Sequence, residues 1–314
     1  MTRLPIGISL SRSLPSALIE AIVAAEQAGH STAWSTIAGT APDAVTTFAA
    51  AATRTDRIQL GTSIVPAYPR HPVMLATQAL VLADLAPGRF RLGIGSSHRP
   101  TIEGVFGLRM DRPLVYMREY FTVLRQLLWE GNTEFSGEFF TVHAALPTGM
   151  APPRTPLLLS ALRPNAFRQA GEIADGAISW VCPIRYLLST ARPALQDGAA
   201  SAGRETPPLI AHVPVVVSED RESAHAIGRR FLNRYARLPF YAGMFARAGY
   251  ELQDDGEVPA SLIENLVVSG DAAQVRDTLT GILSREIDEL LVTVLPGPEQ
   301  EQQEQALIEA LSGI

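Results

Sequence analysis

The sequence predicts one (β/α)8 TIM barrel that covers residues 1–314. Eight short apolar runs alternate with helical patterns along the chain, and this alternation is typical of a parallel sheet. No low-complexity linker divides the chain, and 46% of its residues are hydrophobic, enough for one large core. A doubly wound open sheet has the same alternation, but eight strands favour the barrel.

The expected strands are apolar and rich in β-branched residues, as buried parallel strands usually are. They are residues 4–10, 31–36, 58–65, the run that follows Gly88, 157–160, 177–181, 209–217 and 288–295. The expected helices show apolar positions at helical spacing or start signals such as proline and aspartate. They are residues 15–28, 43–53, 74–85, 114–131, 165–173, 186–202, 219–236, 272–283 and 300–311.

Two segments are too long for ordinary connections between a strand and a helix. Residues 99–113 follow strand four, and the aromatic-rich residues 238–262 follow strand seven without a clear pattern. We expect both to be insertions above the barrel that close over a substrate. A short extra strand at 137–142 and a proline-rich loop at 144–156 complete the expected elements.

Composition excludes several classes of function. The net charge of −6 and the lack of a basic cluster argue against a nucleic-acid partner. No apolar run reaches the roughly 20 residues that cross a bilayer, and no signal peptide is recognisable, so we expect a cytoplasmic protein. All 26 basic residues are arginine, which excludes lysine imines, pyridoxal phosphate chemistry and a lysine-bearing P-loop. The single cysteine and the spacing of His, Asp and Glu predict no metal.

Two loops at the carboxyl ends of strands three and four are candidates for a ligand site. Thr62 and Ser63 end strand three at the face where a barrel binds its ligand, although both hydroxyls could simply bond to backbone. Residues 93–97 leave backbone amides open to an anion, and His98 beside them suits proton donation. The alternative for this second loop is a tight turn with a surface histidine.

Arginines follow strands five and six, where they could hold a phosphate or carboxylate tail. They are Arg163, Arg168 and Arg185. Each one could equally be a solvated helix residue.

Short runs spread over nearly the whole chain carry a family resemblance. They are residues 60–66 with Tyr68, 70–72 and Ala76; 82–85, 88–90 and 92–95; 111–113 with 117–120; 137–140; 174–176; and 267–270 with 288–295. Together they resemble the bacterial luciferase-like superfamily, and most of all the branch that uses the deazaflavin coenzyme F420.

The resemblance implies a flavin-like ring across the strand ends, with its phosphate tail toward the loops after strands four to six. It also implies a cis peptide bond between Ser63 and Ile64, a small-molecule substrate and a homodimer. The residues that it assigns to the cofactor are Ser63, Ile64 and Val65 at the ring, Gly95, Ser96, Ser97 and His98 at the phosphate or ribityl part, and Ser160, Ala161 and Leu162 along the tail.

This chain departs from the resemblance at two places. Several relatives carry an acidic residue and a histidine after strand two, where this chain has only residues 36–39, Thr-Ile-Ala-Gly. The sugar-phosphate dehydrogenases of the family place a glutamate where His98 stands, so His98, or alternatively Glu103, is the expected catalytic proton donor.

The resemblance therefore implies an F420-dependent oxidoreductase that transfers a hydride between the deazaflavin and a small organic substrate. Reduction of a C=C or C=N bond is expected rather than sugar oxidation, because no basic pocket for a sugar phosphate is evident. Two alternatives remain open. One is an FMN-dependent luciferase-like monooxygenase, and the other is a barrel that binds a flavin without catalysis.

Overall fold

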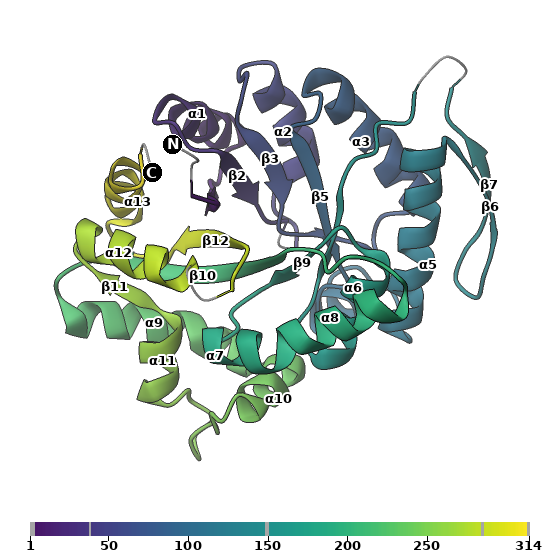
Figure 1. Ribbon diagram of the computed structural model, residues 1–314. Coiled ribbons are helices and arrows are strands. Elements are labelled where there is room, and N and C mark those ends of the chain that lie inside the picture. Colours follow the sequence, from purple (N-terminus) through teal and green to yellow (C-terminus); the bar gives the residue numbers. More distant parts are fainter. Residues whose placement is uncertain (1–3, 38, 148–150, 284–285, 313–314) are drawn as a thin grey trace.

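Eight strands pair side by side in parallel and close into a barrel, with helices around the outside (Figure 1). The strands of the barrel are β1 (Ile6–Ser9), β2 (Thr32–Ser35), β3 (Gln59–Thr62), β5 (Phe90–Gly95), β8 (Leu157–Ser160), β9 (Gly176–Ser179), β10 (Leu209–Val217) and β12 (Glu289–Val294). This computed structural model describes residues 4–37, 39–147, 151–283 and 286–312. The predicted barrel is confirmed, and the pairing of β9 with β10 rules out an open sheet.

The helices outside the barrel also follow the sequence pattern. They are α1 (Pro15–Gln27), α2 (Ala44–Ala52), α3 (Pro72–Leu85), α5 (Pro113–Arg125), α6 (Pro164–Ile173), α8 (Arg192–Ser201), α9 (Arg221–Ala236), α12 (Ala272–Leu283) and α13 (Gln300–Ala310). Proline occupies the first turn of α1, α3, α5 and α6, where its missing N–H costs nothing. None of the helices among the described residues has the length and apolar character needed to cross a membrane.

Two of the predicted long helices contain a wider, π-helical turn. The helix expected at 114–131 is α5 followed by the π turn η1 (Gln126–Glu130). The helix expected at 186–202 is the short α7 (Ile184–Tyr186), the π turn η2 (Leu187–Ala191) and α8. Periodicity alone does not separate these turns from an α-helix.

Side chains fill the inside of the barrel at the end where the strands begin. The Trp34 indole is fully buried there, and an added Cβ at Gly61 would come within 2.4 Å of that ring. The Arg91 guanidinium lies 4.5 Å from the centre of the same ring and forms a two-pronged ion pair with Glu289, with both N to O distances 2.7 Å. A ligand can therefore enter only from the opposite end, where the strands finish.

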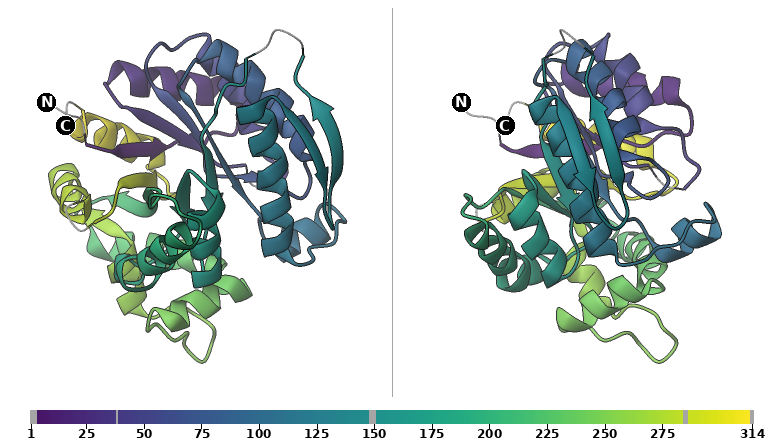
Figure 2. Two further views of the ribbon diagram at one scale, coloured as in Figure 1. Left: turned by 45° about the vertical axis from the view of Figure 1, so that its right-hand side comes forward. Right: turned by 90° about the vertical axis from the view of Figure 1, so that its right-hand side faces the viewer.

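The insertions differ in detail from the expected ones. The segment after β5 contains the short helix α4 (Arg99–Gly104). The segment at 238–262, expected to be irregular, contains α10 (Pro239–Arg247) and the start of α11 (Ala260–Leu266), which leads to β11 (Val268–Gly270). Figures 1 and 2 show this green part of the chain as a lobe that extends away from the barrel.

The expected strand at 137–142 instead covers the connection of an antiparallel hairpin and the first two residues of its second strand. Its strands are β6 (Asn132–Ser136) and β7 (Thr141–Ala145), and residues 137–140 form the connection between them. The hairpin lies along α5 (Figure 2), held by the buried Glu119 carboxylate, which accepts hydrogen bonds from the backbone N–H groups of Glu138, Phe139 and Phe140. It lies on the outside of the barrel, away from the strand ends.

Candidate active site

A cavity of about 890 Å³ opens at the carboxyl ends of the barrel strands. Active sites of (β/α)8 barrels lie at this face. Seven of the predicted site residues line the cavity, namely Ser63, Ile64, Ser96, Ser97, His98, Ser160 and Leu162. The structure therefore brings together the two loops that the sequence singled out and the end of strand five.

Three other predicted cofactor residues lie behind the cavity wall. Val65 is fully buried in the two-residue strand β4 (Val65–Pro66), which pairs with β5. Gly95 lets the wall close tightly, because an added Cβ would lie 2.9 Å from the Cβ of Ser160 and 3.1 Å from the Ile64 side chain. Ala161 is buried beside them and donates its backbone N–H to Ile178 O. These residues shape the wall without lining the cavity.

Glu103 also lies outside the cavity lining. Its carboxylate accepts hydrogen bonds from the Arg99 guanidinium and from the backbone N–H of Met110, the latter at 3.3 Å. Glu103 therefore closes the loop after α4, and the structure does not place it where a substrate would lie.

The wall after β3 is a bulge with the cis peptide bond between Ser63 and Ile64 that the family resemblance implied. Thr36 donates its hydroxyl hydrogen to Ser63 O at 2.7 Å, and Ser63 N donates to Ser35 O at 2.8 Å. Ile37 N bonds to Ile64 O at 3.3 Å. The residues after strand two, which lack an acid or base, thus hold the bulge in position.

The glycine-rich strand β5 carries the second wall. Gly93 approaches β3 so closely that a Cβ would lie 2.0 Å from Thr62 O. The Thr62 hydroxyl fixes this approach, because it accepts from Gly93 N and donates to Gly93 O, both at 2.8 Å. After the strand, Ser97 adopts a left-handed backbone conformation with φ 59°, and this turn leads into α4. Ser96 and Ser97 thereby face the cavity.

The charge of the cavity is positive. Arg163, Arg234 and Arg247 line it, and no aspartate or glutamate is found among the lining residues that the structure describes. Within the described ranges no carboxylate forms an ion pair with these arginines. Arg163 instead lies 4.5 Å over the ring of Phe240. A basic pocket for a sugar phosphate was not evident from the sequence, and the structure brings these three arginines together at the cavity.

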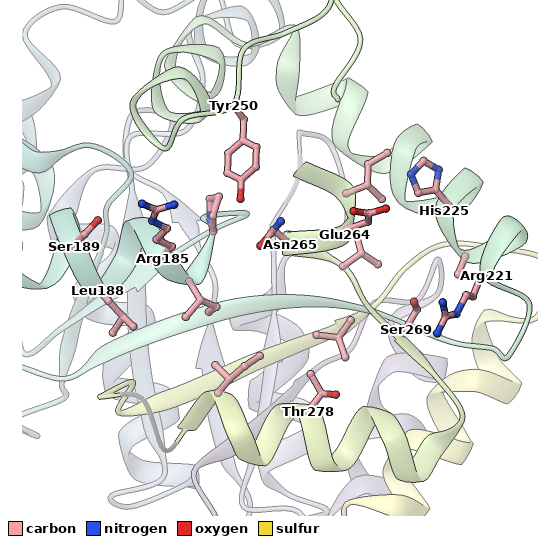
Figure 3. Close-up of a pocket in the computed structure, with 17 residues that line it drawn as sticks. Arg185, Leu188, Ser189, Arg221, His225, Tyr250, Glu264, Asn265, Ser269 and Thr278 are labelled. Carbon is pink, nitrogen blue, oxygen red and sulfur yellow. The ribbon is translucent and has the colours of Figure 1, made fainter. Parts of the chain in front are cut away.

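The arginines predicted to hold a tail have different positions. Of the three, only Arg163 lines the cavity. Arg168 forms an ion pair with Asp197 at 3.0 Å, outside the lining. Arg185 lines a second cavity of about 970 Å³, together with Arg221, His225 and Tyr250 (Figure 3). The described barrel strands contribute no lining residue there, so this second cavity is not at the strand ends.

His98 and an aromatic cluster from α9 and α10 form the remaining wall. Burial lowers the pKa of His98, so its imidazole is neutral at neutral pH. The His98 ring lies 5.6 Å from that of Tyr241, which packs edge-on against Tyr235 at 4.8 Å. A neutral imidazole is a weak proton donor, so its environment does not favour His98 as the acid of a reaction.

The sequence reasoning missed the residues that support this cluster. Trp180 stacks on His212 with ring centres 3.7 Å apart, and its indole N–H donates to the Tyr235 hydroxyl at 2.7 Å. His212 accepts from Val181 N at Nδ1, so its Nε2 carries the hydrogen that Thr293 accepts. Strand alternation would have found His212, because Ile210 two residues earlier points into the barrel. No local signal points to Tyr235.

Comparisons with known proteins identify relatives of this chain. Residues 4–286 match the family model "Luciferase-like monooxygenase". An F420-dependent glucose-6-phosphate dehydrogenase of Beutenbergia cavernae is 34% identical over 240 residues, which cover 72% of this chain and 71% of that protein.

Solved structures show the same fold. An F420-dependent secondary alcohol dehydrogenase in complex with an F420-acetone adduct has a TM-score of 0.79 at 19% identity, covering 99% of both chains. The coenzyme F420-dependent tetrahydromethanopterin reductase of Methanopyrus kandleri has a TM-score of 0.77 at 22% identity, covering 99% of this chain and 98% of that one.

Proposed function

Because the chain belongs to the luciferase-like monooxygenase family and is an enzyme of that family, we propose that it is an oxidoreductase that uses coenzyme F420. The reaction is hydride transfer between the deazaflavin and a small organic substrate. The observation that carries this proposal is a cavity at the strand ends with an apolar wall, a row of serine hydroxyls, three arginines and no lining carboxylate among the described residues.

The residues present fit the cofactor. Ile64 and Ile178 offer an apolar surface to a flat ring, and the wall at Gly95 is so close that any side chain there would disturb it. Ser96 and Ser160 offer hydroxyls for the ribityl or phosphate part. Arg163 stands directly before α6, where a helix N-terminus favours an anion. When bound, the deazaflavin supplies the hydride.

We propose reduction of a C=C or C=N bond as the reaction type. Oxidation of an alcohol needs a base for the hydroxyl proton, and the cavity offers no carboxylate for that role in its described lining. A second candidate, oxidation of an alcohol that carries a phosphate, is favoured by the three arginines in the lining, which form no ion pair with a described carboxylate. The segments with α4 and α10 would exclude water from either reaction.

Fluorescence titration with F420 and with FMN tests the proposal. We expect saturable F420 binding that Ser96→Ala weakens, whereas Ser189→Ala, in the second cavity, leaves it unchanged. Tight FMN binding without any response to F420 would instead favour the monooxygenase alternative. A screen of unsaturated and imine substrates against a sugar phosphate then separates the two reaction types.

The catalytic and assembly proposals have their own tests. Turnover that is unchanged in His98→Ala and in Glu103→Ala, with cofactor binding intact, would favour a barrel that binds without catalysis.

We also propose a homodimer, and sedimentation velocity that shows a single monomeric species at micromolar concentration would contradict it.

A further inference from the structure

The phenol of Tyr235 lines the candidate active site on the side of the strand-seven insertion. Tyr235 belongs to the last turn of α9, and its side chain lies between Trp180 at the end of β9 and Tyr241 on α10. The ring of Phe231, one turn earlier on α9, packs against it at 5.1 Å. Contacts on several sides therefore fix the Tyr235 ring, and Tyr235 is one of the residues that line the cavity.

The hydrogen bond from Trp180 determines what this phenol can do. An indole N–H can only donate, so the Tyr235 oxygen must accept in the 2.7 Å contact. The phenolic hydrogen is then free for another acceptor. Across the part of the chain that the structure describes, no protein acceptor bonds to this hydrogen. Because Tyr235 lines the cavity, a ligand bound there can supply the acceptor.

Trp180 is itself held in place by His212 on β10. Its indole stacks on the buried His212 ring with only 12° between the planes. His212 is fixed by Val181 N at 3.2 Å and by the Thr293 hydroxyl at 3.1 Å. The direction of the indole N–H, and with it the direction of the Tyr235 hydroxyl, is thus set by the barrel strands β10 and β12.

We propose that Tyr235 is the catalytic proton donor of this enzyme. Its substrate then carries either a carbonyl oxygen conjugated with the C=C bond that is reduced, or the nitrogen of a C=N bond that is reduced. This inference rests on the proposed function. It names the substrate class as enones and imines and excludes isolated alkenes, which offer no acceptor to the phenol.

The step balances with the reductant of the proposed function, the reduced deazaflavin. As a hydride and its electron pair reach the β-carbon of an enone, the π electrons move to the carbonyl oxygen. The Tyr235 O–H bond breaks and a new O–H bond forms on the substrate, which leaves an enol and a phenolate. The enol rearranges to the ketone in water, and the phenolate recovers a proton from water. For an imine, the nitrogen takes the proton directly.

Other acids in the cavity fit this role less well. No aspartate or glutamate occurs among the lining residues that the structure describes. Burial keeps His98 neutral at neutral pH. Burial raises the pKa of Tyr235, while the Trp180 N–H and the positive charge of Arg234 lower it. The phenol therefore keeps its proton at neutral pH, and these two groups stabilise the phenolate that forms when the proton leaves.

Binding of cyclohex-2-en-1-one to the cofactor-free protein tests the hydrogen bond, followed by quenching of tryptophan fluorescence. Tyr235→Phe keeps the ring and removes only the hydroxyl. We expect about fivefold weaker binding in this variant, the effect of one neutral hydrogen bond. Tyr250→Phe, which removes a phenol from the second cavity, is the matched control and keeps wild-type affinity. No saturable binding to the wild type, or equal affinity in wild type and Tyr235→Phe, overturns the proposal.

Kinetics with F420 separate this inference from the proposed function. Tyr235→Phe is expected to lower kcat for enone reduction about 100-fold while the affinity for F420 changes less than about twofold. If F420 does not bind the wild type, the proposed function fails. If F420 binds and kcat is unchanged in Tyr235→Phe, only the role of Tyr235 fails.

Trp180 is a positioning residue in this scheme and has its own readout. Trp180→Phe keeps a ring on His212 but removes the N–H that stabilises the phenolate. The pKa of Tyr235, measured as the phenolate absorbance that Tyr235→Phe lacks, is expected to rise in this variant. An unchanged ionisation with full enone turnover would show that Trp180 only fills space.

Discussion

The buried imidazole of His212 makes a quantitative prediction about stability in mild acid. His212 is only 1% exposed, and burial lowers its pKa to about 3. Its Nδ1 accepts the backbone N–H of Val181, so a proton on Nδ1 would place two donors against each other. The other side chains around it, Trp180, Phe231 and Thr293, do not ionise in mild acid.

The sign of the effect follows from proton binding in the two states. The unfolded chain protonates this histidine near its ordinary pKa of 6.5, whereas the folded protein does so only near pH 3. Between these values the unfolded state binds more protons, so the stability present above pH 6.5 is lost as the pH falls. The free energy of unfolding falls by about 1.4 kcal/mol per pH unit in this range. The loss relative to pH 6.5 is therefore roughly 2 to 3 kcal/mol at about pH 4.5.

Urea unfolding followed by circular dichroism measures this effect in the wild type and in His212→Asn. The variant is expected to be less stable at about pH 8. It should also lack the contribution of His212 to the slope of the free energy of unfolding against pH. Because every other group titrates in both proteins, the difference in free energy of unfolding should shrink by roughly 2 to 3 kcal/mol on acidification to about pH 4.5. A difference that stays constant over this range would refute the reasoning.

Three further substitutions test other parts of the molecule. Gly93→Ala places a Cβ 2.0 Å from Thr62 O, so we expect loss of the folded barrel by circular dichroism. Glu119→Gln weakens the three backbone hydrogen bonds that anchor the β6–β7 hairpin, with an expected loss of about 1 to 3 kcal/mol in urea unfolding and faster proteolysis at 132–145. Arg163→Gln should weaken F420 binding about tenfold by fluorescence, since one charged hydrogen bond is removed. Arg168→Gln, outside the cavity, should leave F420 binding unchanged.

The outcome of each substitution can contradict its premise directly. A soluble, folded Gly93→Ala protein would show that β3 and β5 can separate without loss of the barrel. Equal proteolysis of wild type and Glu119→Gln would mean that the hairpin is held by other contacts. Similar F420 affinity in both arginine variants would place the cofactor's anionic part away from α6.

The barrel strands could be predicted because their signals are local. Residues Leu209–Val217 are apolar apart from His212, as is typical of a strand that is buried on both faces. The hairpin strand Asn132–Ser136 was missed because most of its residues are exposed and polar, so no apolar run marks it. Helix α10 was missed because Gly243 interrupts a pattern whose buried positions are Tyr241, Met244 and Phe245.

The candidate site could be predicted only in part, for a different reason. The hydroxyls at 62–63 and the glycines and serines at 93–97 follow strands directly, so the strand assignment placed them at one face. Tyr235 and Arg234 lie at the end of a helix, and their position over the cavity depends on how α9 returns to the barrel. The pairing of Trp180 with Tyr235 joins residues 55 positions apart, and no sequence pattern encodes that contact.

The two sides of the cavity come from different parts of the chain. One side suits the cofactor, and the other suits the substrate. The walls from β3, β5 and β8 are fixed by backbone bonds and close approaches of glycine, so they suit a constant ligand such as a cofactor. The opposite wall comes from the end of α9 and from α10, which together contribute Tyr235, Phe240 and two of the three arginines. Substitutions in α10 that spare Phe240 and Arg247 should therefore change substrate choice while leaving cofactor affinity intact, because among the described residues the hydrogen bonds that support the bulge at Ser63 and Ile64 come from residues 35–37 and not from α10.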